Sequence, residues 1–307
     1  MTEARRLLVT GGTGFIGKVL CRSLLQCGYR VTVLTRNAAA ASQALPLPGI
    51  DFVESLDVLG ANGLWFGVVN LAGQPLDSGR WNSDRKVEFR DSRINLTKAL
   101  VLWMGELDQS PEVFVSASAT GWYGHWHDEL LDEDSRCNTG YAQRLCADWE
   151  QAARDGLPKG CRGCQLRIGI VLGPSGGPLS AMLTPARLGL GGAMGTGVQW
   201  WSWIQVEDLV RLICFLLEEA TIEGAVNGTA PNPVRQRDFA KILGRVLGRP
   251  ALLPLPGFVA SLVLGEFADE ILLKGQRVVP ARALEAGFTF DYPELGDALK
   301  ATIDVPR

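Results

Sequence analysis

Residues 10–17 read TGGTGFIG and carry the strongest indication of this chain's fold. An apolar run at residues 7–9 precedes it, and apolar residues at helical spacing follow it. Strand, glycine turn and helix in this order are typical of a parallel sheet that binds a dinucleotide, with its phosphates at the positive end of the helix. Gly11 allows the tight turn, Gly14 lets the backbone approach a pyrophosphate, and Gly17 lets the helix pack on the strand. The cofactor contacts predicted in this turn are Gly11, Thr13, Gly14, Phe15, Ile16 and Gly17.

The second predicted strand, residues 29–34, indicates which dinucleotide binds. An NAD site usually places an Asp or Glu roughly 20 residues past the glycines, where it holds the ribose 2′-hydroxyl. This chain has no carboxylate between Gly17 and Asp51, and Arg36 stands in that place. A guanidinium favours a 2′-phosphate through charge-assisted hydrogen bonds, so we predict NADP(H). The alternative is that Arg36 only ends a solvated strand.

The composition indicates a globular protein without a nucleic-acid or membrane partner. The chain has 307 residues, is 47% hydrophobic and carries a net charge of −3, enough to bury a large core in one or two domains. Its charge pattern predicts no nucleic-acid partner and no basic face for a membrane. The sequence shows no signal-peptide pattern and no apolar run of the ~18 residues that a membrane span needs. We therefore predict a cytoplasmic protein with a small-molecule substrate, and its oligomeric state, monomer or homodimer, stays open.

The seven cysteines form no recognisable framework. Cys161 and Cys164 make a lone C-x-x-C, and the two histidines, His125 and His127, do not complete a zinc site. We predict no metal and interpret the two cysteines as surface thiols in a reducing compartment.

Strand-like apolar runs alternate with helical patterns, which predicts an α/β fold with a Rossmann-type doubly wound parallel sheet. Residues 1–173 form the predicted NADP-binding domain, to which a segment at about 204–230 returns. Residues 174–203 and 231–307 form a smaller, discontinuous and mainly helical substrate region, with a glycine-rich lid at 186–199. Further strands are expected near 51–53, 66–71, 113–116, 166–172 and 225–227, and helices near 81–107, 140–154 and 206–219.

Several motifs give the chain a family resemblance. With the opening glycine turn, the segments NLAG at 70–73, SASAT at 116–120 and LRIGIVLGP at 166–174 resemble the extended short-chain dehydrogenases/reductases. More narrowly, the chain is similar to an atypical, epimerase-family branch that carries a C-terminal domain of unknown function. The motifs for this branch are Arg80-Trp81, RDSR at 90–93, Trp149-Glu150, Trp203-Ile204, Asn227-Gly228 and GQRV at 275–278. The resemblance implies that Leu71, Ala72 and Gly73 pass close to the cofactor.

The resemblance also implies a mechanism, from which this sequence departs. In active extended members, a Ser or Thr polarises a carbonyl and a Tyr transfers the proton. A Lys four residues later lowers the Tyr pKa from its ordinary value near ~10. Ser118 fits the first position and Tyr141 the second, but Leu145 occupies the Lys position. Catalysis by a Tyr–Lys pair is therefore not implied.

Three residues offer a replacement for the missing lysine or a different proton donor. Arg93, near the family's usual active-site Asn, would bring positive charge, whereas Arg144 would point about 100° away around its helix. Tyr123 could act as the acid/base in place of Tyr141, and for each tyrosine a purely packing role is the other interpretation.

Two further sets of residues are candidates for the site or its support. Arg167, in a buried strand, requires an acidic or phosphate partner. Trp81, Trp200 and Trp201 are candidate walls of a substrate pocket.

Two functions follow from these observations. The first is an NADP(H)-dependent oxidoreductase or epimerase that acts on a small carbonyl or hydroxyl compound, with Ser118 and Tyr141 or Tyr123 as catalytic residues. The second is an NADP(H)-binding regulatory or interaction protein that has lost turnover, which Leu145 favours. Epimerisation of a sugar nucleotide is a weaker third reading, because it rests on analogy of fold.

Overall fold

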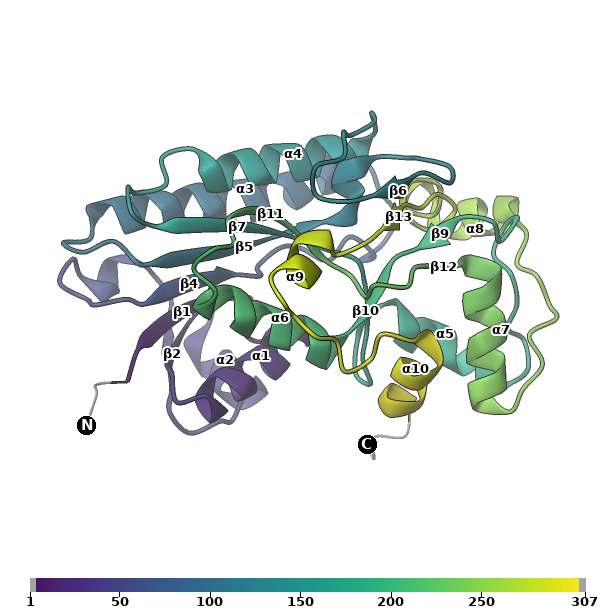
Figure 1. Ribbon diagram of the computed structural model, residues 1–307, viewed down its shortest axis with the longest axis horizontal. Coiled ribbons are helices and arrows are strands. Elements are labelled where there is room, and N and C mark those ends of the chain that lie inside the picture. The colour runs from purple at the N-terminus through teal and green to yellow at the C-terminus, as the bar shows by residue number, and fades with distance from the viewer. Residues whose placement is uncertain (1–3, 304–307) are drawn as a thin grey trace.

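The computed structural model describes residues 4–303, and within them seven parallel strands form a central sheet (Figure 1). The strand order is β11-β7-β5-β4-β1-β2-β3. The chain adds β2 and β3 on one side of β1 and the later strands on the other side. The boundary between β1 and β4 is therefore the switch point at which α/β sheets bind ligands. This architecture confirms the predicted Rossmann-type α/β fold. The strands are β1 Arg6–Thr10, β2 Arg30–Leu34, β3 Ile50–Val53, β4 Gly67–Asn70, β5 Val113–Ala119, β7 Arg162–Ile168 and β11 Gly224–Gly228.

The apolar run before the glycine turn is the centre of this sheet. Leu7, Leu8 and Val9 of β1 are completely buried, as expected for a parallel strand covered on both faces. Val9 pairs in register with Val33 of β2 and Val69 of β4. The turn that follows is thereby fixed at the carboxyl edge of the sheet.

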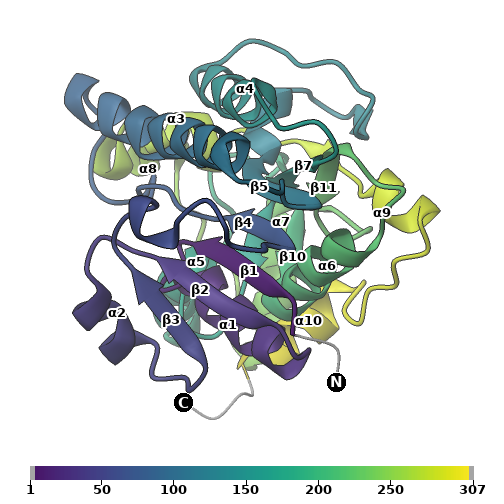
Figure 2. The same cartoon turned by 90° about the vertical axis from the view of Figure 1, so that its left-hand side faces the viewer.

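Helices cover both faces of the sheet (Figure 2). On one face, α1 and α6 pack against β1, β2 and β11 in a core that includes Leu20 and Leu209. On the other face lie α3 and α4, and Leu100 and Met104 of α3 pack on Phe114 of β5. The helices of this part are α1 Phe15–Gln26, α2 Ala38–Ala44, α3 Ser83–Glu106, α4 Tyr141–Arg154 and α6 Val206–Glu218.

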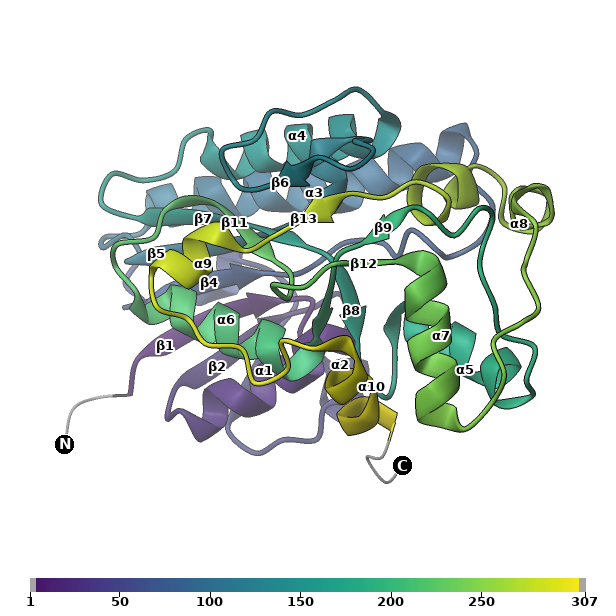
Figure 3. The same ribbon diagram turned by 45° about the vertical axis from the view of Figure 1, so that its right-hand side comes forward.

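A second group of elements lies beside the central sheet (Figure 3). Its own core is built around Trp201, Trp203 and Phe239. Three pairs of short strands among the described residues lie outside the central sheet: β8 pairs with β10, β9 with β12, and β6 with β13. The boundaries predicted for a separate substrate domain remain a prediction. The strands are β6 Leu130–Leu131, β8 Ile170–Leu172, β9 Trp200–Trp201, β10 Trp203–Gln205, β12 Val234–Arg235 and β13 Arg277–Val278. The helices are α5 Gly177–Arg187, α7 Gln236–Leu247, α8 Gly257–Leu264, α9 Ala281–Glu285 and α10 Leu295–Ile303, with a π-helical turn, η3, at Ala268–Leu272.

Two expectations about the region around β7 are wrong. The single strand predicted at 166–172 breaks at Gly169, because a Cβ there would lie 2.4 Å from the Ser202 carbonyl oxygen, and β8 pairs with β10 in another sheet. Cys161 and Cys164 are not surface thiols: both side chains are buried, and burial raises the pKa of each. They pack at the start of β7.

Candidate functional site

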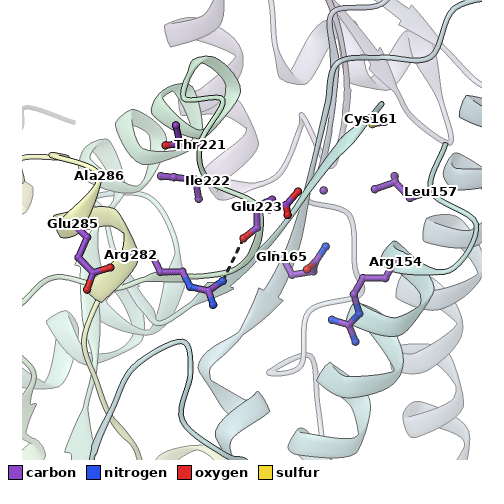
Figure 4. Close-up of a pocket in the computed structure, with 12 residues that line it drawn as sticks. Arg154, Leu157, Cys161, Gln165, Thr221, Ile222, Glu223, Arg282, Glu285 and Ala286 are labelled. Carbon is purple, nitrogen blue, oxygen red and sulfur yellow. Dashed lines mark hydrogen bonds between the residues drawn. The ribbon is translucent and has the colours of Figure 1, made fainter. Parts of the chain in front are cut away.

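Two cavities lie at opposite ends of the sheet. The first, of about 800 Å³, opens beside the amino ends of β7 and β11, where Arg154, Gln165 and Arg282 face it (Figure 4). The Arg282 guanidinium is already held by the Glu223 carbonyl oxygen at 3.3 Å. Ligands of open α/β sheets bind outside the carboxyl ends of the strands, so this cavity lies at the wrong end for the dinucleotide.

The second cavity, which we call the cleft, lies at the carboxyl ends and has a volume of about 380 Å³, within the usual range of ligand sites. Phe15 and Ile16 of the glycine turn border it on one side. Its remaining walls are mostly apolar and come from segments that lie far apart in the sequence. They include Trp81, Thr120, Tyr141, Leu145, Ile170, Trp200, Trp201, Phe267 and Ile271.

The glycine turn has the shape that a pyrophosphate requires. Gly11 adopts a φ of +69°, and a Cβ on Gly17 would lie 2.1 Å from the Gly11 carbonyl oxygen. Gly14 precedes α1, and among the described residues no side chain caps the first N–H groups of this helix. These donors point outward at the positive end of the helix dipole, so the turn fits a dinucleotide's phosphates.

Phe15 has a partner that the sequence reasoning missed. Its ring lies over a second glycine cluster, where a Cβ on Gly173, Gly176 or Gly177 would come within 3.1 Å of it. The Phe15 ring, at the first residue of α1, thus packs against the turn after β8 and the start of α5. The closely spaced glycines after β8 are the sequence feature that could have indicated this contact.

The segment after β4 is held against the first strand. The N–H of Leu71 donates to the Thr10 carbonyl oxygen, and the N–H of Ala72 donates to the Thr10 hydroxyl. A Cβ on Gly73 would lie 2.9 Å from the Arg93 guanidinium carbon, so Arg93 packs directly against this turn. Arg93 is buried and donates to two backbone carbonyl oxygens, of Gln74 and Phe89.

Tyr141 borders the cleft, as expected, at the first residue of α4. Its hydroxyl donates to the Lys86 carbonyl oxygen at 3.3 Å, and the Lys86 ammonium lies 4.7 Å from its ring centroid. Burial raises the pKa of Tyr141, and the nearby Arg93 offsets this rise only in part. Leu145, one turn later, also lines the cleft, so no cation occupies the usual lysine position.

The structure places Ser118 outside the lining of the cleft. This side chain is buried at 3% exposure and donates to Glu150 at 2.8 Å, on the side of the sheet that α4 covers. The hydroxyl that does line the cleft belongs to Thr120, just past the end of β5. The end of the strand explains the difference: Ser116 and Ser118 share one face of β5, whereas Thr120 opens the 3₁₀ turn after Ala119 and no longer follows the strand's alternation.

Tyr123 is also turned away from the cleft. It is completely buried, and its hydroxyl accepts from Arg167 and donates to Asn227. Burial raises its pKa to about 12. Arg167 in turn makes two hydrogen bonds to Glu150, which confirms that this buried guanidinium has an acidic partner.

The remaining predicted residues lie partly at the cleft and partly outside it. Arg36 is exposed just past β2, with a side chain that makes no hydrogen bond to the described residues. Trp81, Trp200 and Trp201 all border the cleft. The glycine-rich lid expected at 186–199 does not line it, because backbone hydrogen bonds tie Gly191 and Ala193 to Leu253 and Leu255.

A glycine turn at a sheet's switch point, beside an apolar cleft, defines a Rossmann-type dinucleotide-binding protein. The sequence pattern of the NAD dependent epimerase/dehydratase family matches residues 7–227, and that of a domain of unknown function, DUF1731, matches residues 255–302. The chain therefore belongs to the NAD dependent epimerase/dehydratase family. Both parts of the expected resemblance are confirmed.

Relatives cover nearly the full length. The chain is 41% identical to "Epimerase family protein SDR39U1 homolog, chloroplastic" of Arabidopsis thaliana, over 95% of this chain and 85% of that protein. The crystal structure of the human epimerase family protein SDR39U1 (isoform 2) with NADPH matches at a TM-score of 0.89 and 37% identity, over 98% of this chain and 100% of that one. The UDP-glucuronic acid 4-epimerase of Bacillus cereus with UDP-glucuronic acid and NAD matches at a TM-score of 0.75 and 18% identity, over 97% and 98% of the chains, and shows a shared fold only.

No helix among residues 4–303 is both long and apolar enough to cross a membrane. The cytoplasmic location stays a prediction, since the relative from Arabidopsis thaliana is chloroplastic by name.

Proposed function

We propose that this protein is an NADP(H)-dependent oxidoreductase or epimerase that acts on an apolar carbonyl or hydroxyl compound in the cleft. The observation that carries the proposal is that Tyr141 and Thr120 line one apolar cavity together with Phe15 and Ile16 of the dinucleotide turn. The Tyr141 phenol, the Thr120 hydroxyl and the dinucleotide turn therefore border the same cavity. The human relative crystallised with NADPH supports the choice of cofactor.

Particular residues would hold the cofactor. The N–H groups at the start of α1 suit the pyrophosphate, Arg36 suits the 2′-phosphate, and the backbone at Leu71–Gly73 would pass beside the nicotinamide half. When bound, the cofactor supplies or accepts a hydride at its nicotinamide ring. Arg93, packed against Gly73, would put positive charge beside this ring and beside Tyr141.

We infer different chemical roles for the two hydroxyl groups in the cleft. Thr120, rather than Ser118, would donate a hydrogen bond to the substrate oxygen, and Tyr141 would exchange the proton with it. The apolar walls favour an apolar substrate over a sugar nucleotide, because a buried sugar hydroxyl without a partner is costly. Trp81, Phe267 and Ile271 form the wall that such a substrate would contact.

A second candidate function is favoured by Leu145. A leucine in the lysine position, beside a tyrosine whose pKa is raised, suits an NADP(H)-binding regulatory protein that has lost turnover. The two candidates share the cofactor and differ only in chemistry.

Binding and turnover measurements separate the candidates. We expect NADPH to bind more tightly than NADH in a fluorescence titration, and Arg36→Ser to remove about tenfold of that preference through lost charge-assisted hydrogen bonds. In a screen of aromatic and aliphatic carbonyl compounds, Thr120→Val and Tyr141→Phe should each lower kcat by about 10²-fold or more, as expected for oxyanion and proton-transfer groups.

The matched control for these variants is Ser118→Ala, which removes a hydroxyl outside the cleft and should leave kcat nearly unchanged. Tight NADPH binding with no turnover of any compound would favour the regulatory protein. Loss of turnover in Ser118→Ala alone would contradict the role of Thr120.

A further inference from the structure

One ion pair adjoins Tyr141 at the edge of the cleft. Lys86, in the first turn of α3, donates to Glu266, which lies between α8 and η3, at 2.6 Å. Glu266 directly precedes Phe267, which lines the cleft. The two charged residues are 180 positions apart in the sequence, so the pair joins α3 to the C-terminal wall of the cleft.

Lys86 contacts Tyr141 through both its backbone and its side chain. The Tyr141 hydroxyl donates to the Lys86 carbonyl oxygen at 3.3 Å, and the Lys86 ammonium lies 4.7 Å from the centroid of the Tyr141 ring. Tyr141 and Phe267 both pack edge-on against Trp81, with ring centroids 5.1 and 6.0 Å from that of Trp81. These contacts hold the phenol and the ion pair in one arrangement.

The charges in contact with the phenol have opposite signs. Burial raises the pKa of Tyr141, Arg93 lowers it, and the Glu266 carboxylate raises it further. The positive charge of Lys86 is offset by its short contact with Glu266. A cation therefore lies over the ring, but its partner cancels the effect that a lysine at position 145 would have on the phenol.

Further charged or titratable groups lie around the cleft. Glu270 and Lys274 are paired with each other at 3.2 Å, and burial raises the pKa of Cys146 to about 12, so this thiol stays neutral. The others are Asp77, exposed in the lining of the cleft, and Arg80, which packs against Gly265. All of them stay unchanged when Lys86 or Glu266 is substituted, so they do not decide the direction of a difference between such variants.

We propose that the Lys86–Glu266 pair holds Tyr141 in its phenol form, with Glu266 as the controlling charge. The pair thereby favours the reaction direction in which Tyr141 gives its proton to a carbonyl oxygen. Lys86 and Glu266 are positioning residues, because they act through Tyr141. This inference rests on the proposed function for the role of Tyr141 as the proton donor.

Removing either charge breaks the same ion pair but should act on Tyr141 in opposite directions. Glu266→Gln removes a negative charge and leaves Lys86 unopposed, so the phenolate becomes more stable and the titration midpoint of Tyr141 should fall by about one pH unit. Lys86→Met leaves Glu266 unopposed, so the midpoint should rise. The hydrogen bond of the phenol survives in Lys86→Met, because its acceptor is a backbone oxygen. A purely structural link between α3 and the cleft wall would respond alike to both substitutions.

Fluorine NMR measures this titration without turnover. The full chain is produced with 3-fluorotyrosine at its four tyrosine positions, and Tyr141→Phe identifies the Tyr141 signal. Fluorine lowers the pKa of a phenol, which keeps the titration away from strongly alkaline pH. The matched control is Glu88→Gln, which breaks the Arg85–Glu88 pair on the same helix outside the cleft and should leave the midpoint unchanged. Midpoints that move in the same direction in Glu266→Gln and Lys86→Met, or that do not move, would overturn the proposal.

The rate of alcohol oxidation gives a second readout, because this direction needs the phenolate. The pH of half-maximal rate should fall in Glu266→Gln and rise in Lys86→Met, in step with the NMR midpoints. Opposite NMR shifts in a chain that turns over no alcohol would support the action of the pair on Tyr141 while the proposed function failed. An active chain whose rate profile does not follow the NMR midpoints would overturn the role of the pair in the direction of the reaction.

Discussion

At the scale of single residues, Ser118 and Thr120 differ in whether their hydroxyl groups reach the cleft. The sequence places a hydroxyl at the carboxyl end of β5, where sites of α/β proteins gather. It does not show where the strand ends, because SASAT suits both a strand and a turn. Ser118 is the last inward-facing residue on the α4 side, whereas Thr120 opens the 3₁₀ turn that enters the cleft. Two residues separate a structural hydroxyl from a candidate catalytic one.

The protonation of Tyr141 gives a prediction about direction and pH. Its pKa is raised above the ordinary value near ~10, so the phenol stays protonated between about pH 6 and 9. A protonated phenol donates, so carbonyl reduction should be nearly independent of pH in this range. Alcohol oxidation needs the phenolate and should become faster as pH rises.

Steady-state rates in both directions, with Tyr141→Phe as the control, measure this dependence. A reduction rate that falls through a midpoint below about pH 8 would contradict the raised pKa, because a depressed pKa would then be needed.

The Arg167–Glu150 pair predicts a large effect on stability. Both side chains are buried, and removing one partner leaves an uncompensated buried charge, which typically costs about 3–5 kcal/mol. Arg167→Leu should therefore lower the free energy of unfolding in urea by at least about 3 kcal/mol. The exposed Lys300–Asp297 pair is the control, since Lys300→Met should change it by less than about 1 kcal/mol. Similar losses of unfolding free energy in the two variants would contradict a stabilising role for the buried pair.

At the scale of elements, the glycine turn and α1 form one unit whose geometry the sequence largely predicted. The spacing of Gly11, Gly14 and Gly17 indicates a helix packed tightly on its strand, and the structure places Gly17 against Gly11. The sequence did not reveal the break at Gly169, because apolar residues continue on both sides of it. The contact that forces this break, with the Ser202 carbonyl, is formed by a distant segment.

The close packing of α1 gives a prediction about cofactor binding. A methyl group at Gly17 would lie 2.1 Å from the Gly11 carbonyl oxygen, so Gly17→Ala must displace α1 from the turn. We expect Gly17→Ala to weaken NADPH binding by about tenfold or more, because the N–H groups at the start of α1 would no longer point at the pyrophosphate. Gly105→Ala in α3 is the control: no atom lies within 4 Å of its Cβ position, and it should raise stability by up to about 1 kcal/mol. Unchanged NADPH affinity in Gly17→Ala would contradict the role of the turn.

At the scale of the whole molecule, the cleft is the feature that the sequence could not assemble. Its walls come from the glycine turn, from the region of Trp81, from the start of α4, and from η3 near the C-terminus. Sequence patterns predict each element locally, but which faces meet depends on how the C-terminal elements pack over the carboxyl edge of the sheet.

If the cleft carries out NADP(H)-dependent chemistry, deuterium should pass from the cofactor to a carbonyl compound bound there. The full chain is incubated with NADPH deuterated at nicotinamide C4 and with aromatic aldehydes, and the alcohol products are analysed by mass spectrometry. We predict deuterated alcohol from wild type and from Ser118→Ala, and at least about 10²-fold less from Thr120→Val and Tyr141→Phe. Tight NADPH binding with no deuterium in any product would contradict such chemistry in the cleft.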